Sequence, residues 1–256
     1  MSAETVRFDV RGHRAEVTID SPAKRNALSA PVVAGLHDAL ERAAADDAVR
    51  VITLTAVGHV FCAGADLKDE PDGGGDPRAA RAGALFTALL RCPKPIVANV
   101  NGHARAAGVG LIGACDIAVA VEGATFAINE VRVGLLPATV AVPLARRMTP
   151  AALRRYALTG EVFDAAAGVR AGLLDDHGDA GYVTDAVETL VEEFGACEPD
   201  ALRRVKPYLA ALAATPPEDA EALAVAESRR AFESPPAAEG RRAFRERRPP
   251  AWSATR

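Results

Sequence analysis

Strand-like and helix-like patterns of apolar residues alternate along the first quarter of the chain. Thr5 to Val10 and Arg14 to Asp20 alternate well enough to predict two strands, joined at Gly12 as a hairpin. Apolar residues from Val32 to Ala43 then recur with a period of about 3.6 and predict a helix. Val51 to Val57 is nearly continuously apolar, which is typical of a strand buried on both faces.

The central stretch, Pro95 to Glu130, has two strand-like runs separated by unusually small side chains. Ile96 to Val100 and Ile117 to Val121 predict strands, and glycines and alanines from Ala104 to Gly110 lead into a helix. Small residues let other atoms approach the backbone, and a helix N-terminus offers unpaired N–H groups and the positive end of a dipole. This arrangement suits a developing negative charge, although close packing of a helix on a sheet selects the same residues.

The second half of the chain is predominantly helical, because strand patterns nearly vanish beyond Pro150. Residues 69–77 are acidic and rich in Gly and Pro, which predicts a mobile surface loop. We expect a strand-and-helix body at 1–195, a helical region at 196–256 and no clean internal repeat. The predicted helices are Arg78–Arg91, Ala151–Leu158, Asp164–Ala171, Asp185–Phe194, Pro199–Leu212, Glu218–Phe232 and Pro236–Arg245.

Composition is that of an ordinary globular protein and excludes few functions. The 256 residues carry 30 Lys and Arg against 34 Asp and Glu, and a net charge of −4 does not favour binding to nucleic acid or to a membrane. The longest apolar runs are shorter than the roughly 20 residues of a membrane span. The start of the chain lacks a signal-peptide pattern. Four cysteines without metal-ligand spacing predict free thiols in a reducing cytoplasm, and no metal or redox cofactor is expected.

Two segments rich in small residues each follow a predicted buried strand. Cys62 to Leu67 follows the first strand, and Gly102 to Gly108 follows the second. If parallel strands bring both segments to one edge of a sheet, two backbone N–H groups could converge on one oxygen. Each donor of such an oxyanion hole typically lowers a reaction barrier by about 2.7–4 kcal/mol.

An ordered set of segments covering nearly the whole chain resembles the crotonase (enoyl-CoA hydratase/isomerase) superfamily. One such motif alone would be a weak signal, but the ordered set is specific. The segments are RNALS near the start, FCAGADL, NGHARAAGVGLIGACDIAVA, INEVRVGLLPA, LTGEVFDAAAGVRAGLLDD and the closing EGRRAFRERRPPAW.

The resemblance implies an α/β, crotonase-like spiral of ββα units with a C-terminal helical trimerisation region. Residues 1–195 would form the acyl-CoA-binding core, and residues 196–256 would build a homotrimer or a hexamer. No cofactor is implied, since coenzyme A is part of the acyl-CoA substrate.

The resemblance also implies the roles of particular residues. The backbone N–H groups of Ala65 and Ala107 would stabilise a thioester enolate, and Glu130 would be the general acid and base. Lys24 and Arg25 of RNALS would border the adenine and pyrophosphate of coenzyme A. Ala63, Asp66 and Leu67 would line the pantetheine and the thioester, and Gly108 would also bind the substrate.

The chain departs from the two-glutamate hydratases of this superfamily at two places. Their first acid lies three residues beyond the second N–H donor, where this chain has Gly110; their second acid matches Glu130. Ala106-Ala107 replaces the usual glycine pair, which should be tolerable because the chemistry requires only the backbone N–H.

A single carboxylate leaves three functions open. We predict an enoyl-CoA hydratase-like enzyme of fatty acid metabolism, slow on simple straight-chain substrates, because losing one general acid or base typically costs about 10²–10⁴-fold in rate. The alternatives are a Δ3,Δ2-enoyl-CoA isomerase, in which one glutamate moves a proton between carbons, and a catalytically silent acyl-CoA-binding fold.

Two alternative functions, dinucleotide binding and RNA binding, are less well supported by the sequence. Gly108 to Gly113 matches GxGxxG, with Glu130 about 20 residues on, as in a dinucleotide site. However, seven residues separate the predicted strand from the first glycine, whereas that fold requires a tight turn. An RNA-binding module is disfavoured because aromatic residues make up only 5% of the chain.

Among other candidates, His59 and His103 are predicted to be loop histidines with backbone partners, and Asp116 to be structural. Cys62 lies beside the proposed hole but has no identifiable base.

Overall fold

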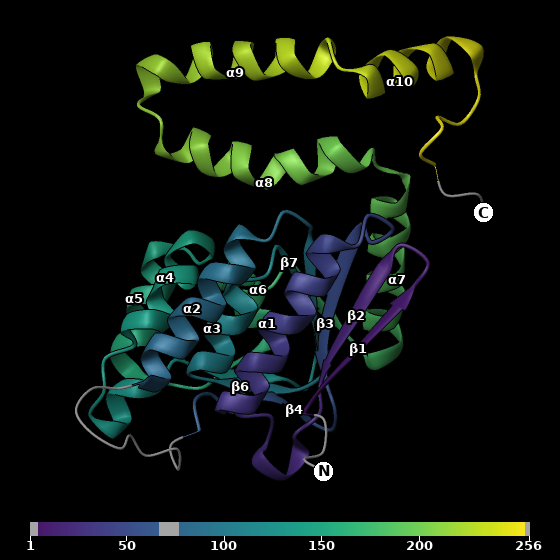
Figure 1. Cartoon of the computed structure of the whole chain (residues 1–256). Helices are drawn as coiled ribbons and strands as arrows, with labels where there is room; N and C mark the ends of the chain where they lie inside the picture. Colours follow the sequence, from purple (N-terminus) through teal and green to yellow (C-terminus); the bar gives the residue numbers. More distant parts are fainter. Residues whose placement is uncertain (1–4, 67–76, 254–256) are drawn as a thin grey trace.

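Two largely parallel sheets form the body of the molecule (Figure 1). The computed structural model describes residues 5–66 and 77–253, so the loop predicted at 69–77 lies almost entirely outside the described residues. The larger sheet has the order β1-β2-β3-β5-β7-β10; β1 and β2 form the predicted antiparallel hairpin, and the other neighbours are parallel. Its strands are β1 (Val6–Arg11), β2 (Arg14–Ile19), β3 (Val51–Ala56), β5 (Ile96–Val100), β7 (Ile117–Val121) and β10 (Asp176–Gly178).

A second, smaller sheet has the order β4-β6-β8-β9. The first three strands run parallel, and the last is antiparallel to β8. Its strands are β4 (Val60–Cys62), β6 (His103–Arg105), β8 (Thr125–Ala127) and β9 (Phe163–Asp164).

The two sheets are linked by a repeated ββα path, which confirms the expected spiral. Each turn adds one strand to the large sheet, one to the small sheet and then a helix: β3-β4-α2, β5-β6-α3 and β7-β8-α4. The expectation of no clean internal repeat concerned the sequence pattern, and the repeat exists in space. It is hidden in the sequence because the small-sheet strands have only two or three residues, too few to show a period.

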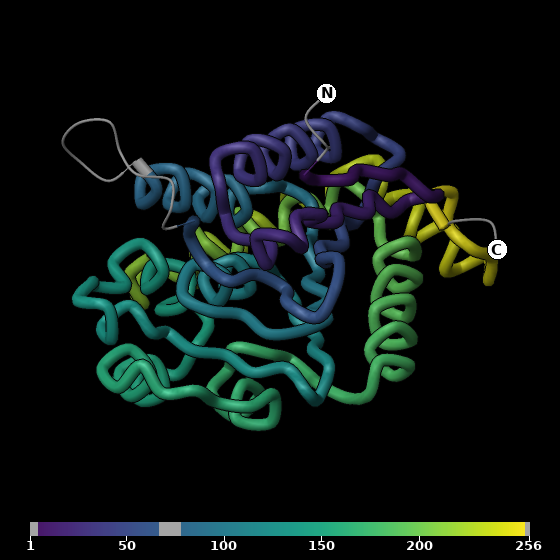
Figure 2. The backbone as a smooth tube through the Cα atoms, turned by 90° about the horizontal axis from the view of Figure 1, so that it is seen from below, coloured from purple at the N-terminus to yellow at the C-terminus, as the bar shows by residue number. Residues whose placement is uncertain are grey.

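Helices cover both faces of the large sheet. Figures 1 and 2 show α1 and α7 on opposite faces. Val187 and Val191 of α7 pack on Val51 and Val97, while Ile52 and Leu54 belong to the main core on the other face. Burial on two sides explains why β3 is nearly continuously apolar. The helices of the body are α1 (Ala30–Ala45), α2 (Pro77–Arg91), α3 (Ala107–Gly113), α4 (Ala138–Arg147), α5 (Pro150–Thr159), α6 (Ala165–Ala171) and α7 (Ala180–Ala196), with 3-10 turns η1 (Pro22–Lys24) and η2 (Glu130–Val133).

Three further helices, α8 (Pro199–Ala214), α9 (Pro217–Phe232) and α10 (Pro235–Glu246), form an arm outside the body. In Figure 1, α8 lies over one end of the body, and α9 and α10 form a layer beyond it. Lys206 of α8 anchors the arm, because its Nζ lies 2.8 Å from Oδ2 of Asp116. The same oxygen accepts the N–H of Ile96 at 2.8 Å, so Asp116 has the structural role that was predicted.

Asn26 fastens the loop after η1 to the turn between β3 and β4. Its buried side chain donates to the carbonyls of Val57 at 2.9 Å and Val60 at 2.6 Å, and accepts the N–H of Ser21 at 2.9 Å. Its φ of 53° is left-handed, a conformation that Asn tolerates better than most residues. Asn26 therefore holds the neighbouring Lys24 in place.

We expect Asn26→Asp to lower the free energy of unfolding by at least about 2 kcal/mol. The substitution keeps the shape but replaces the amide that donates to two carbonyls with a carboxylate that cannot donate to them. Urea denaturation measures the loss. Asn101→Asp is the matched control, because Asn101 donates to the single carbonyl of Gly58 and should cost less. An equal loss in both variants would contradict this role of Asn26.

Candidate active site

The candidate site lies where three parallel strands of the small sheet end. Cys62 of β4 is paired with Ala104 of β6, which is paired with Phe126 of β8. Because the strands run in one direction, the segments that follow them, 63–66, 106–107 and 128–130, leave the same sheet edge, where ligands of parallel sheets commonly bind. The structure therefore brings the two loops rich in small residues together and places Glu130 after the neighbouring strand.

Glycines allow these loops to meet backbone to backbone. A Cβ atom on Gly108 would lie 2.3 Å from the carbonyl oxygen of Cys62, so no other residue fits there. Gly64 has a φ of +97°, and a Cβ atom on it would lie 3.0 Å from the carbonyl oxygen of Arg105 and 3.6 Å from the amide nitrogen of Ala107. The loop that carries Ala65 thus lies against the first residue of α3.

The amides of Ala65 and Ala107 are both unused donors within the described part of the chain. Ala107 is the first residue of α3, where an N–H has no intrahelical partner. Ala65 lies opposite Leu28 in an isolated bridge whose bond runs from the N–H of Leu28 to the carbonyl of Gly64 at 2.8 Å. Two contacting loops therefore each offer a free N–H group.

Ala106, the residue before α3, has a backbone conformation that normally requires glycine. Its φ is 48° and its ψ is −118°. An L-residue is strained in this region because its Cβ atom crowds the backbone. The structure accommodates an alanine where the resemblance leads one to expect glycine, and it does so with strain beside a candidate donor.

Glu130 begins η2 with a carboxylate that lacks partners. Both of its oxygens are buried, and neither has a hydrogen-bond partner among the described residues. Burial raises the pKa of Glu130 above its ordinary value, while its own backbone amide opposes the shift. The adjacent Asn129 also has a buried Oδ1 atom without a partner there. The segment after β8 is therefore rich in unsatisfied acceptors, and its carboxyl group is able to exchange a proton.

The residue three positions beyond Ala107 is Gly110, and the space that a side chain would need there is already occupied. A Cβ atom on Gly110 would lie 2.8 Å from Cζ of Phe86 in α2. Sequence reasoning missed Phe86, because it is one apolar position among several on an amphipathic helix and nothing local connects it to Gly110. Asn26 was also missed, although its residue type suits a left-handed position.

The residues expected near coenzyme A lie on two touching loops. The N–H of Ala63 donates to the carbonyl of Arg25 at 3.1 Å. Nζ of Lys24 lies 2.8 Å from Oδ2 of Asp66; the Lys24 side chain is 60% exposed and that of Asp66 only 11%. The two residues were assigned to different ends of the ligand, but the structure pairs them. Leu67 lies outside the described residues.

The other titratable candidates have structural explanations. Burial raises the pKa of the Cys62 thiol to about 12, which removes it as a nucleophile at neutral pH. Nδ1 of His103 accepts the N–H of Thr125 at 3.1 Å, and burial, followed by the charge of Arg105, lowers the pKa of His103. His103 therefore has the backbone partner that was predicted, although it begins strand β6 and does not lie in a loop.

Residues 5–66 and 77–253 contain neither a metal-ligand cluster nor a candidate membrane-spanning helix. No group of three or more His, Cys, Asp or Glu side chains in these ranges could hold a metal ion. None of the helices in these ranges is long and apolar enough to cross a membrane.

Comparison with known proteins gives one consistent result. Residues 12–255 match the family model described as enoyl-CoA hydratase/isomerase. A putative enoyl-CoA hydratase from Thermus thermophilus is 35% identical over 252 residues, which cover 94% of this chain and 97% of that protein. An (E)-benzylidenesuccinyl-CoA hydratase from Thauera aromatica is 30% identical over 207 residues, which cover 78% and 80% of the two chains.

A solved structure agrees with these sequence matches. The enoyl-CoA hydratase of Mycobacterium smegmatis superposes with a TM-score of 0.91 at 32% identity, covering 98% of this chain and 99% of that one.

We expect Ala106→Gly to raise the free energy of unfolding by up to about 1 kcal/mol. Relief of roughly 1–2 kcal/mol of left-handed strain exceeds the added flexibility of glycine, about 0.5–1 kcal/mol. Ala114→Gly, at a right-handed position with a φ of −86°, is the control and should destabilise. Urea denaturation of both variants checks the signs, and destabilisation by Ala106→Gly would show that Ala106 is not strained.

Proposed function

Because this chain belongs to the enoyl-CoA hydratase/isomerase family, we propose that it is an enoyl-CoA hydratase-like enzyme that uses Glu130 as its general acid and base. One observation carries the proposal. Among the described residues, a buried carboxylate without a partner leaves the same sheet edge as two loops that each offer an unbonded N–H group. A fold that had no use for these groups would be expected to pair or expose them.

In this proposal the amides of Ala65 and Ala107 hold the thioester oxygen. Negative charge grows on that oxygen when a nucleophile adds to the conjugated double bond, and preorganised donors stabilise the resulting enolate. Glu130 takes a proton from water as the water oxygen bonds to the β-carbon, and then returns a proton to the α-carbon. The sum is addition of one water molecule across the double bond, with the carboxylate regenerated.

Coenzyme A would lie along the two loops that meet at Ala63 and Arg25. The cations of Lys24 and Arg25 supply charge for its phosphates, and Asp66 holds the Lys24 ammonium. Three of the four free cysteines are buried, which fits a reducing compartment such as the cytoplasm.

Double-bond isomerisation is the second candidate, and the structure offers one specific observation in its favour. Glu130 is the sole carboxylate proposed for catalysis, and the ring of Phe86 fills the space beside Gly110. A single base beside an enolate-stabilising hole can remove a proton from one carbon and return it to another without water.

We expect Glu130→Gln to lower kcat by about 10²-fold or more while leaving acyl-CoA binding nearly intact. Incubation with a panel of enoyl-CoA thioesters and mass spectrometry measure the rate and distinguish hydration, which adds 18 mass units, from isomerisation. Glu122→Gln, at an exposed position, is the control. A wild-type rate in Glu130→Gln would make Glu130 a bystander, and no turnover by any variant would favour a silent acyl-CoA binder.

The same variant has an expected effect on stability that depends on pH. Since the folded pKa of Glu130 is raised above 4.5, its ionised form destabilises the fold. Glu130→Gln should therefore unfold at a higher temperature than the wild type at pH 8. The difference should shrink as the pH falls through the raised pKa and vanish below about 4.5.

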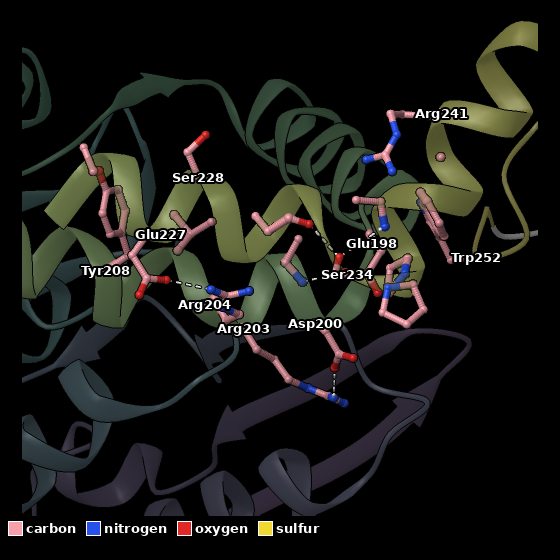
Figure 3. A pocket seen from close by; sticks show the side chains of 18 residues that line it. Glu198, Asp200, Arg203, Arg204, Tyr208, Glu227, Ser228, Ser234, Arg241 and Trp252 are labelled. Carbon is pink, nitrogen blue, oxygen red and sulfur yellow. Dashed lines mark hydrogen bonds and ion pairs between the residues drawn. The ribbon is translucent and has the colours of Figure 1, made fainter. Parts of the chain in front are cut away.

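We also propose that the chain assembles as a trimer or a hexamer through its arm. Neither α8 nor α9 buries a side chain, and both expose large apolar residues, including Val205 and Leu209 on α8 and Phe232 on α9. Figure 3 shows a groove between the arm helices, with Tyr208 and Arg204 of α8 facing Glu227 of α9 and Trp252 at its far end. The groove has a volume of about 960 Å³ and mostly apolar walls. A monomer would leave this surface in water at a free-energy cost.

Light scattering should give a mass three or six times that of the 26.6 kDa chain. Val205→Glu/Leu209→Glu should lower that mass, because it places charges on the apolar face of α8. Val10→Glu, at an exposed apolar position on β1, is the control and should leave the mass unchanged. A monomer at micromolar concentration for the wild-type chain would refute the assembly.

A further inference from the structure

The side-chain direction of Gly110 is blocked by one aromatic ring. A Cβ atom there would lie 2.8 Å from Cζ and 3.0 Å from Cε2 of Phe86, and 3.4 Å from Cα of Val140. The first distance is too short for a Cβ atom in an undistorted core, and the second would require the ring to shift slightly. The obstacle is the tip of a side chain from α2, so a single substitution can remove it.

The ring itself is firmly held. Phe86 is only 1% exposed and belongs to the main core, and its helix α2 packs against both α3, which carries Gly110, and α4, which carries Val140. Close packing leaves such a ring few alternative positions. The space beside Gly110 is therefore filled by an apolar ring in the close-packed core.

The other glycines of α3 face different obstacles. Gly108 faces the backbone of Cys62, which no substitution of a side chain can clear, and Gly113 faces the side chain of Leu144 at 2.5 Å. Gly113 lies three residues beyond Gly110, about 4.5 Å farther along the helix axis from the free amide of Ala107. Position 110 thus combines a removable obstacle with a location one turn from the candidate donor.

We propose that Phe86, by filling the space beside Gly110, excludes a second acid–base group and makes Glu130 responsible for every proton transfer. Phe86 is in this sense a positioning residue that decides between reactions. The inference rests on the proposed function. With the ring present, the carboxylate that accepts a proton must also return it, which suits proton transfer between carbons and slow addition of water. With the ring removed and a glutamate at 110, one carboxylate can take a proton from water while the other protonates the α-carbon.

The test compares F86A/G110E with F86A, G110E and the wild type, using hydration and double-bond migration of the same enoyl-CoA thioesters. In F86A/G110E the ratio of hydration to migration should rise at least tenfold over F86A, and the pH profile of kcat/KM should gain a second ionisation. G110E alone should not gain either property, because the ring still fills the space. The matched control L144A/G113E, which buries a glutamate one turn farther on, should also show neither.

A second experiment avoids placing a charged residue in helix α3. Truncation of the ring in F86A leaves room for a small acid, so added formate should accelerate hydration by F86A but not by L144A or the wild type. Circular dichroism and binding of a saturated acyl-CoA establish that each variant is folded.

The outcomes separate the two proposals. If F86A/G110E is folded and its product ratio matches F86A, or if G110E alone gains hydration, the role of Phe86 is overturned. If F86A/G110E does not fold, the absence of a formate effect in F86A overturns it. If the wild type shows no activity that depends on Glu130, the proposed function fails instead, whatever the Phe86 variants do.

Discussion

Direct backbone contact between the β4 segment and the residues on either side of β6 is the constraint on which the site depends. Cβ atoms on Gly102 and Gly108 would lie 2.1 and 2.3 Å from the carbonyl oxygens of His59 and Cys62, so glycine is required at both ends of this contact. Because the two segments touch before and after their strands, the register of β4 on β6 is determined. The loops that follow the two strands therefore leave the sheet side by side. The amides of Ala65 and Ala107 owe their proximity to this contact.

The same region contains two energetically unfavourable features. Ala106 is strained, and the Glu130 carboxylate is buried without a partner among the described residues. Both would be removed by selection for stability alone, and such features persist where the surrounding structure holds them in place. Here the surrounding structure is one continuous core that reaches from the large sheet through α1 to α4. The presence of both features at one sheet edge supports placing the proposed chemistry there.

The helix that begins at the site ends where the arm is attached. Arg147 donates to the carbonyls of Cys115 and Asp116 just beyond α3, at 3.1 and 3.0 Å. Asp116 in turn binds Lys206 of α8. The small sheet and the arm lie toward opposite ends of the body in Figure 1, and α3 is the rigid element between them. Contacts between subunits at the arm would therefore be linked to α3, the helix whose first residue carries the Ala107 amide.

Local regularity in the sequence determined much of the fold. Long elements such as α1, α2 and β3 were predicted almost to their ends, because periodicity is a property of neighbouring residues. The loops around Ala65 and Ala107 stood out for the same reason, since runs of Gly and Ala are visible without knowledge of the fold. The choice of Glu130 came from resemblance, and the structure adds only that its carboxylate is buried and lacks a partner in the part of the chain that is described.

Only the tertiary structure decided which distant residues meet. The small-sheet strands are too short to leave a pattern, so β4 and β6 were hidden inside predicted loops. Lys24 and Asp66 were predicted separately, and their pairing depends on the contact between two loops 42 residues apart. Phe86 and Gly110 were unconnected in the sequence because nothing local marks which side chain of α2 points at α3. Such contacts depend on the register of two sheets and on the packing of helices against them, and these are set by the chain as a whole.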